Sequence, residues 1–177
     1  MINRFIFNQL RDEISYPEIV ILLGPRQVVK TTLLKQLEEY VKSIHKPTSF
    51  FDLEQPQTLA EFNRPDHEIV ERLKNSGKVV FIDELQYIRN ASKILKAIYD
   101  SGAGTKLVCS GSSSLEIHKH LKESLAGRRF TFRIYPLQYA EIKASRNYSA
   151  HCRSERGASQ FCGVIFVKTN QGQGNIF

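Results

Sequence analysis

The chain alternates between short, continuously apolar segments and longer segments in which apolar residues recur every three or four positions. The apolar segments cover residues 18–23, 49–53, 78–82, 106–110 and 129–134. The segments 18–23, 78–82 and 106–110 are unbroken rather than alternating, as in strands buried on both faces of a parallel sheet. We therefore predict five strands in a mainly parallel central sheet.

The segments between the predicted strands have helical spacing. Three of them carry an apolar stripe: Leu33, Leu34, Leu37 and Val41; Ile94, Leu95 and Ile98; and Ile117, Leu121 and Leu125. Gly127 is well placed to end the third helix as its C-terminal cap. Strands that alternate with helices predict an α/β, doubly wound fold.

This regular pattern is lost at about residue 145. The segment 145–160 is rich in Ser and Arg and has no clear period, the segment 161–167 is an isolated apolar run, and the last residues are typical of coil. We predict one domain at residues 1–144 and an irregular C-terminal tail at residues 145–177. A truncated or frame-shifted gene end would produce such a change in composition.

Composition narrows the class of protein. A length of 177 residues suits one domain with its own core. No apolar run reaches the roughly 20 residues that a membrane span needs, and the N-terminus lacks a signal peptide's apolar region. We therefore expect a cytoplasmic protein without a membrane partner. The formal net charge of +7 is diffuse, with both signs interspersed, so it supports nucleic-acid binding only weakly.

A loop of nine residues joins the first predicted strand to the first helical segment. It consists of Gly24, Pro25, Arg26, Gln27, Val28, Val29, Lys30, Thr31 and Thr32. Strand, loop and helix in this order are the context of a Walker A loop, whose backbone N–H groups and helix end surround phosphate oxygens. In that motif a lysine reaches the β- and γ-phosphates and a Ser or Thr hydroxyl ligates Mg²⁺. Lys30 and Thr31 match those two residues.

Val29 departs from the motif. The consensus G-x-x-x-x-G-K-[ST] is met at Gly24, Lys30 and Thr31, but Val29 stands where the second glycine belongs. Glycine lets the backbone approach phosphate and adopt unusual φ values, and a β-branched residue is among the worst replacements. The loop alone therefore leaves a fortuitous strand–turn–helix unit as an equal alternative.

Two adjacent carboxylates favour the nucleotide interpretation. Asp83 and Glu84 directly follow the apolar strand 78–82. In a Walker B strand the first acid holds Mg²⁺, while the next orients or deprotonates the attacking water. Solvated acids at a strand end are the alternative, but their place after the loop, with one strand between, makes coincidence a poor explanation.

A cluster of serines follows the fourth predicted strand. Ser110 and Ser112 stand where the strand ends, and ligands of α/β sheets bind at the carboxyl ends of strands. A hydroxyl here could contact a γ-phosphate, or it could cap the following helix. Both interpretations can hold at once.

Seven local motifs together resemble a known family. They are GPRQVVKTTLL, FFDLEQP, VVFIDELQY, KILKAIYD, KLVCSGSSSLEI, ESLAGR and YPLQYAEI, in order and with sensible spacing over residues 3–142. This set is similar to the prokaryotic AAA-domain ATPases of the AAA_14 type. The resemblance implies a three-layer αβα P-loop NTPase core that takes ATP and Mg²⁺. Members normally carry a further C-terminal domain similar to restriction-endonuclease folds, which is not recognisable after residue 142.

The resemblance also implies roles for individual residues. Gly24, Lys30, Thr31, Asp83 and Glu84 match the family's nucleotide site, and Ser110 falls in its sensor region. Arg128 in the ESLAGR motif corresponds to an arginine that contacts the γ-phosphate or reaches a neighbouring subunit of a homo-oligomer. A cation favoured by the dipole at a helix end is an equally good explanation for Arg128.

Two hypotheses follow for the function. The first is an ATP-binding AAA-type module, the motor part of a larger ATPase, that hydrolyses ATP with Mg²⁺. The second is a non-catalytic remnant that keeps the fold and acts as a binding module. Lys30, Thr31, Asp83 and Glu84 favour the first, while Val29 and the unrecognised C-terminal domain favour the second.

Overall fold

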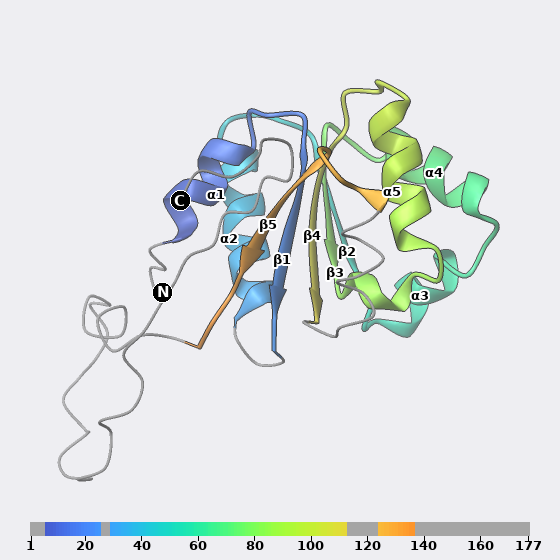
Figure 1. The fold of residues 1–177 in the computed structure, drawn as a ribbon, viewed down its shortest axis with the longest axis horizontal. Coiled ribbons are helices and arrows are strands. Elements are labelled where there is room, and N and C mark those ends of the chain that lie inside the picture. The colour runs from blue at the N-terminus through green and yellow to red at the C-terminus, as the bar shows by residue number, and fades with distance from the viewer. Residues whose placement is uncertain (1–5, 26–28, 113–123, 137–177) are drawn as a thin grey trace, which may run out of the picture.

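A five-stranded parallel sheet forms the centre of the computed structural model, which describes residues 6–25, 29–112 and 124–136. The strands are β1 (Ile19–Gly24), β2 (Thr48–Asp52), β3 (Val79–Asp83), β4 (Lys106–Ser112) and β5 (Arg129–Arg133). Their order across the sheet is β2-β3-β4-β1-β5, and every pair is parallel (Figure 1). All five predicted strands are confirmed, with ends displaced by at most two residues, which is the usual disagreement at element ends.

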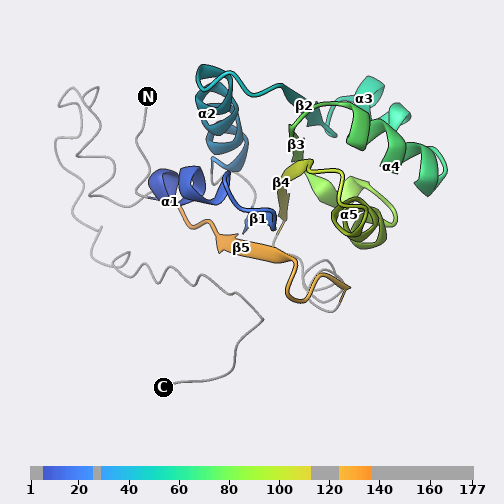
Figure 2. The ribbon, with the colours of Figure 1, turned by 90° about the horizontal axis from the view of Figure 1, so that it is seen from above.

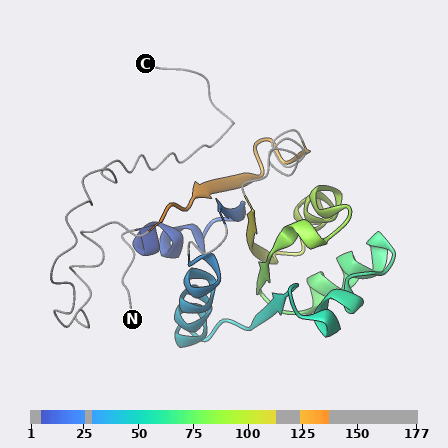
Figure 3. The ribbon, with the colours of Figure 1, turned by 90° about the horizontal axis from the view of Figure 1, so that it is seen from below.

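Helices cover both faces of the sheet. They are α1 (Ile6–Glu13), α2 (Lys30–Ser43), α3 (Pro56–Glu61), α4 (Asp66–Asn75) and α5 (Ala91–Asp100), with a 3₁₀ turn, η1 (Leu85–Tyr87). Figures 2 and 3 show α1 and α2 on one side of the sheet and α3, α4 and α5 on the other. The two predicted helices that correspond to α2 and α5 are confirmed. The third predicted helix lies almost wholly outside the described residues.

The strands have two buried faces, as their unbroken apolar character predicts. In β1, Ile19, Ile21 and Leu23 belong to the core cluster on the α3–α5 side, whereas Val20 and Leu22 belong to the cluster under α1 and α2. Successive residues of a strand point to opposite faces, so an all-apolar strand can fill both layers. The three-layer αβα class predicted for this chain is confirmed.

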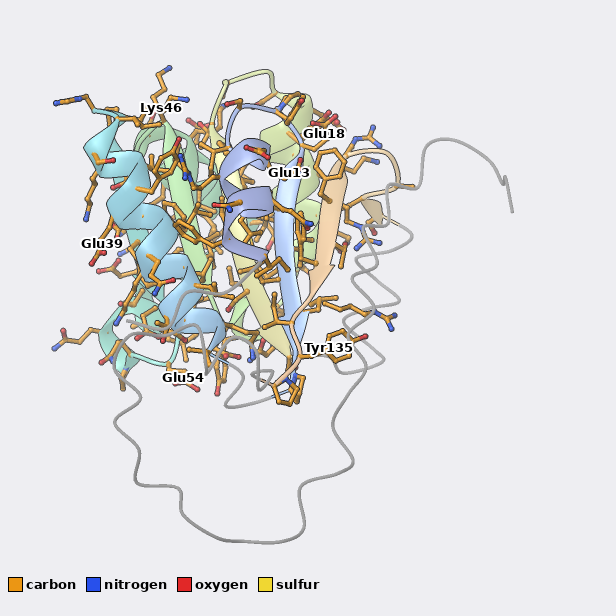
Figure 4. The ribbon with its side chains drawn as sticks, turned by 90° about the vertical axis from the view of Figure 1, so that its left-hand side faces the viewer. Glu13, Glu18, Glu39, Lys46, Glu54 and Tyr135 are labelled. Carbon is orange, nitrogen blue, oxygen red and sulfur yellow. The ribbon has the colours of Figure 1, made fainter. Side chains whose placement is uncertain are left out.

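Parallel pairing gives the sheet two chemically distinct edges. Glu54 and Tyr135, which follow β2 and β5, lie at the bottom of Figure 4, while Glu18 and Lys46, which precede β1 and β2, lie at the top. The phosphate loop follows β1, and the acidic pair follows or ends β3. Because β4 lies between β1 and β3, the loop, the acids and the end of β4 meet at the bottom edge.

The predicted boundary at residue 144 falls beyond the last described residue, so the division into domain and tail stays a prediction. Within the described ranges, no helix is both long and apolar enough to cross a bilayer.

Candidate nucleotide-binding site

The phosphate loop leaves the sheet at Gly24 and enters α2 at Lys30. Gly24 still pairs with Ser112 of β4, and Val29 is the residue immediately before the helix. The predicted loop residues Arg26, Gln27 and Val28 lie outside the described residues. Val29 has φ 66° and ψ 24°, which is the left-handed region. The motif's second glycine would adopt this conformation freely, whereas an L-residue carries a cost of about 1–2 kcal/mol there.

The ammonium group of Lys30 lies between the end of β1 and the acid that follows β3. Its Nζ donates hydrogen bonds to the carbonyl oxygens of Gly24 at 3.2 Å and Pro25 at 3.0 Å. The same Nζ lies 3.8 Å from Oε1 of Glu84. Lys30 is only 4% exposed. A lysine has three donors, and the carbonyl oxygens of Gly24 and Pro25 engage two of them.

Ser110 links the two acids. Its Oγ donates to Oδ1 of Asp83 and accepts the backbone N–H of Glu84 at 3.0 Å. The serine is fully buried, and Asp83 is 2% exposed. The sequence left open whether Ser110 contacts a γ-phosphate or caps a helix, and in the structure its hydroxyl is engaged by the acidic pair. Its observed position makes it a support for Asp83 and Glu84.

Glu84 turns away from the strand direction. Its φ of 59° and ψ of 54° are again left-handed, which is uncommon for a residue that is not glycine. The bond from its N–H to Ser110 accompanies this turn, so the chain leaves β3 abruptly and starts η1. Non-glycine residues in this region often occur at functional sites, where the surrounding contacts hold them.

Gln86 completes the cluster, and it is not among the residues predicted from the sequence. Its Nε2 donates to Oε2 of Glu84, and its Oε1 accepts the backbone N–H of Ser112 at 3.1 Å. Gln86 stands two residues after Glu84 in DELQ, but its contact with β4 joins residues 26 positions apart. The motif placed Gln86 near the site, and only the fold reveals its partner.

The residues predicted to hold Mg²⁺ are the ones that the fold brings to this edge. Asp83 ends β3, and Thr31 is half-buried in the first turn of α2. Thr32, next to it, is exposed. Among the described residues, no three or more His, Cys, Asp or Glu side chains gather as a metal cage. Mg²⁺ in phosphate sites needs only one or two carboxylates besides phosphate oxygens and waters, so this donor set fits Mg²⁺.

Arg128 is not brought to this cluster. It directly precedes β5, and its carbonyl oxygen accepts the N–H of Ile19 at the start of β1. Its Nε pairs with Oδ1 of Asp100, the last residue of α5, at 2.7 Å. The arginine therefore lies at the opposite edge of the sheet from Lys30, and a contact with the γ-phosphate of its own chain does not fit that position. A contact with a neighbouring subunit's nucleotide stays a prediction.

The most strongly shifted ionisable groups that the structure describes do not belong to this cluster. Burial lowers the pKa of Lys106, at the start of β4, from 10.5 to about 8, although Glu13 and Glu18 partly oppose the shift. Its ammonium donates to the carbonyl oxygens of Tyr16, at 2.9 Å, and Glu18. Burial also raises the pKa of the Cys109 thiol from 9.0 to about 12, as expected for a small core residue without redox chemistry.

Known relatives share much of this chain. It is 26% identical over 155 residues to an uncharacterized protein of Methanocaldococcus jannaschii. The aligned region covers 78% of this chain and 31% of the relative. It is 24% identical over 159 residues to an uncharacterized protein of Haemophilus influenzae, which covers 82% of this chain and 39% of that protein. The chain therefore spans well under half the length of these relatives.

Solved structures share the fold. The replication initiator DnaA bound to AMPPCP and single-stranded DNA superimposes with a TM-score of 0.53 at 12% identity, over 78% of this chain and 49% of DnaA. PCH-2 of C. elegans gives a TM-score of 0.53 at 16% identity, over 76% of this chain and 44% of PCH-2. Residues 16–143 match the AAA domain family AAA_14, which includes the phosphate loop, the acidic pair and Ser110. The chain belongs to this family of AAA domains.

Proposed function

We propose that this AAA domain binds ATP with Mg²⁺ at the carboxyl edge of its sheet and hydrolyses it. One observation carries the proposal. Lys30 begins α2, and Asp83 and Glu84 stand at the end of β3, yet contacts through Ser110 and the Lys30–Glu84 pair join them into one buried cluster. Burial of a cation and two acids away from water costs free energy. Clusters of this kind are found at functional sites, so a phosphate-binding site explains this one better than a purely structural contact does.

Each residue of the cluster has a distinct task in this proposal. Lys30 exchanges its contacts with the Gly24 and Pro25 carbonyls for phosphate oxygens. Asp83 and the hydroxyl of Thr31 hold Mg²⁺, which neutralises phosphate charge when bound. Glu84 orients the attacking water and accepts its proton. Backbone N–H groups at the start of α2 complete the phosphate contacts.

DnaA, which has the same fold, was solved with the ATP analogue AMPPCP and with single-stranded DNA. This supports a nucleotide as the ligand here. Since the chain covers less than half of its relatives, we propose a motor role within a larger ATPase, in the cytoplasm. Assembly with further copies, in which Arg128 reaches a neighbour's nucleotide, belongs to the same proposal.

The alternative is a binding module without hydrolysis, and Val29 is the observation that favours it. A branched side chain at φ 66° stands where the loop should bring bare backbone to the phosphates. This module would keep the fold and lose turnover.

Substitution of the acidic pair tests the proposal. Glu84→Gln should remove most ATP turnover and leave the ATP dissociation constant within a few-fold, because Glu84 acts on water rather than phosphate. Asp83→Asn should instead weaken binding only when Mg²⁺ is present. ATP turnover and nucleotide titrations with and without Mg²⁺ measure both effects, and Glu39→Gln, on the exposed face of α2, is the matched control. Equal turnover in the wild type and Glu84→Gln would refute hydrolysis, and tight binding without turnover would establish the binding module.

A further inference from the structure

Gln86 connects the acid at the end of β3 to the end of β4. Its amide nitrogen donates to Oε2 of Glu84, and its amide oxygen accepts the N–H of Ser112. Gln86 stands in η1 and is half-buried. One side chain therefore spans two neighbouring strand ends at the nucleotide edge.

The chemistry of a primary amide suits this position. Glutamine has donors on its nitrogen and an acceptor on its oxygen, so it can satisfy a carboxylate and a backbone N–H at the same time. A glutamate in its place could still accept from Ser112, but it would face Glu84 with a like charge. A methionine of similar length would make neither bond.

The three groups around Glu84 leave its carboxylate little freedom. Its backbone N–H is held by Ser110, its Oε2 by Gln86, and its Oε1 lies 3.8 Å from the Lys30 ammonium. Without Gln86, Oε2 would have no anchor among these contacts, and the carboxylate could rotate. A rotated carboxylate would lie away from the attacking water.

Gly111 lies beside this arrangement. A Cβ on Gly111 would lie 3.5 Å from Oε1 of Gln86 and 3.6 Å from Cδ2 of Leu23, which is ordinary contact distance, so the Gln86 amide lies next to the backbone of β4 at Ser112.

We infer that Gln86 is a positioning residue that fixes the carboxylate of Glu84 by tying it to the end of β4. The inference rests on the proposed function, because Glu84 must act on water for its orientation to matter. It adds a specific claim: turnover depends on the donor of Gln86, while nucleotide affinity does not.

Nuclear magnetic resonance tests the contact without any need for turnover. In the ¹⁵N-labelled full chain, the side-chain NH₂ signals of Gln86 are assigned by their loss in Gln86→Met. We expect this NH₂ group to exchange with water more slowly than that of Gln57, an exposed glutamine of α3, and to shift in Glu84→Ala. Exchange as fast as that of Gln57, with no shift in Glu84→Ala, would overturn the inference.

Kinetics test the consequence. Gln86→Met and Gln86→Glu should each lower kcat by about tenfold or more, since misplacement of a reacting group by about 1 Å can cost a hundredfold. The ATP dissociation constant should change by less than about threefold, because neither variant alters a group placed on phosphate. Gln57→Met is the control, and each variant is measured both with the native Val29 and with Val29→Gly.

A failure of the inference about Gln86 can be distinguished from a failure of the proposed function. If Gln86→Glu turns over at the wild-type rate while Glu84→Gln does not, the proposed function stands and the positioning role of Gln86 is overturned. If Glu84→Gln keeps wild-type turnover, or if no protein hydrolyses ATP, the proposed function fails, and the exchange rate of the Gln86 amide alone decides whether it fixes Glu84.

Discussion

Val29 carries its unfavourable conformation in the folded chain itself. Its φ of 66° precedes α2, and its carbonyl oxygen accepts the N–H of Leu33 as the helix begins. The left-handed conformation therefore lowers the free energy of unfolding rather than adding a cost when nucleotide binds. Any loss of affinity must come from the isopropyl group itself, which limits how closely phosphate approaches the N–H groups of the loop.

Val29→Gly should consequently change two quantities. The free energy of unfolding should rise by up to about 1 kcal/mol, since relief of about 1–2 kcal/mol is offset by the extra entropy of glycine in the unfolded chain. The dissociation constant for MgATP should fall about tenfold or more, equivalent to about 1.4 kcal/mol. Urea denaturation measures the first and titration with a fluorescent nucleotide measures the second.

Two further variants control this experiment. Val29→Ala should recover part of both effects, because it removes the β-branch and keeps a Cβ. Lys30→Ala combined with Val29→Gly should abolish the gain in affinity. The prediction is wrong if the wild type already binds MgATP as tightly as Val29→Gly does.

At the residue scale, the sequence identified the main residues of the candidate nucleotide site but not the contacts between them. Lys30, Asp83 and Glu84 were predictable because each follows an apolar strand within a motif of fixed spacing. The bond between Gln86 and Ser112 was not, because it depends on how two strands are paired. The position of Arg128 could have been predicted from the sequence, because a residue that precedes a parallel strand lies at the amino edge of the sheet, away from the phosphate loop.

At the scale of elements, β4 is fixed at both ends by polar side chains. Ser110 joins it to the acidic pair at the nucleotide edge, and Lys106 joins its start to the connection between α1 and β1. Lys106 is 6% exposed, so its charge is held by carbonyl oxygens and the nearby acids Glu13 and Glu18 in place of water.

Because Lys106 is buried, the free energy of unfolding should depend on pH in the alkaline range. The pKa of Lys106 is about 8 in the folded chain, compared with 10.5 for a lysine in the unfolded chain. Between these two pH values the unfolded chain therefore binds more protons than the folded chain. The free energy of unfolding attributable to Lys106 is therefore lowest below pH 8 and increases as the pH rises from about 8 to 10.5. Lys106→Met should remove this increase, as measured by urea denaturation at pH 7.5 and 9.5.

A comparison with the wild type isolates the lysine. Cys109 has the opposite effect above pH 9, because its pKa is raised in the folded chain, but both proteins contain it. If the two proteins show the same pH dependence, Lys106 is ionised alike in the folded and unfolded chains and the prediction is wrong.

The helices show why some elements were predicted and others were not. α2 and α5 carry apolar stripes over 14 and 10 residues, and both were recognised. α1 and α3 are only 8 and 6 residues long, too short for a reliable period. α4 buries only Ile69 and Leu73 and is otherwise polar, so its sequence gives a weak signal.

At the scale of the whole molecule, the two apolar layers that the structure describes lie between Ile6 and Ile134. A chain that ends at residue 144 should therefore unfold with a free energy within about 1 kcal/mol of the full chain. It should also be more soluble, because the deletion removes the uncharged apolar segment 161–167. Urea denaturation and the soluble fraction after expression measure the two effects. Failure of the shorter chain to fold would show that the tail contributes to the core.

The order of strands has a consequence for how this chain acquires its structure during synthesis. Among the strands that the structure describes, β1 pairs with β4 and β5, so Val20 meets Val108 and Ile19 meets Arg129. The ribosome therefore releases β1 long before either neighbouring strand is synthesised. Until then the apolar residues of β1 are not covered by the sheet. Such distant pairings slow folding and lengthen exposure to aggregation, so production of this domain should benefit from slow translation or from chaperones that shield the nascent strand.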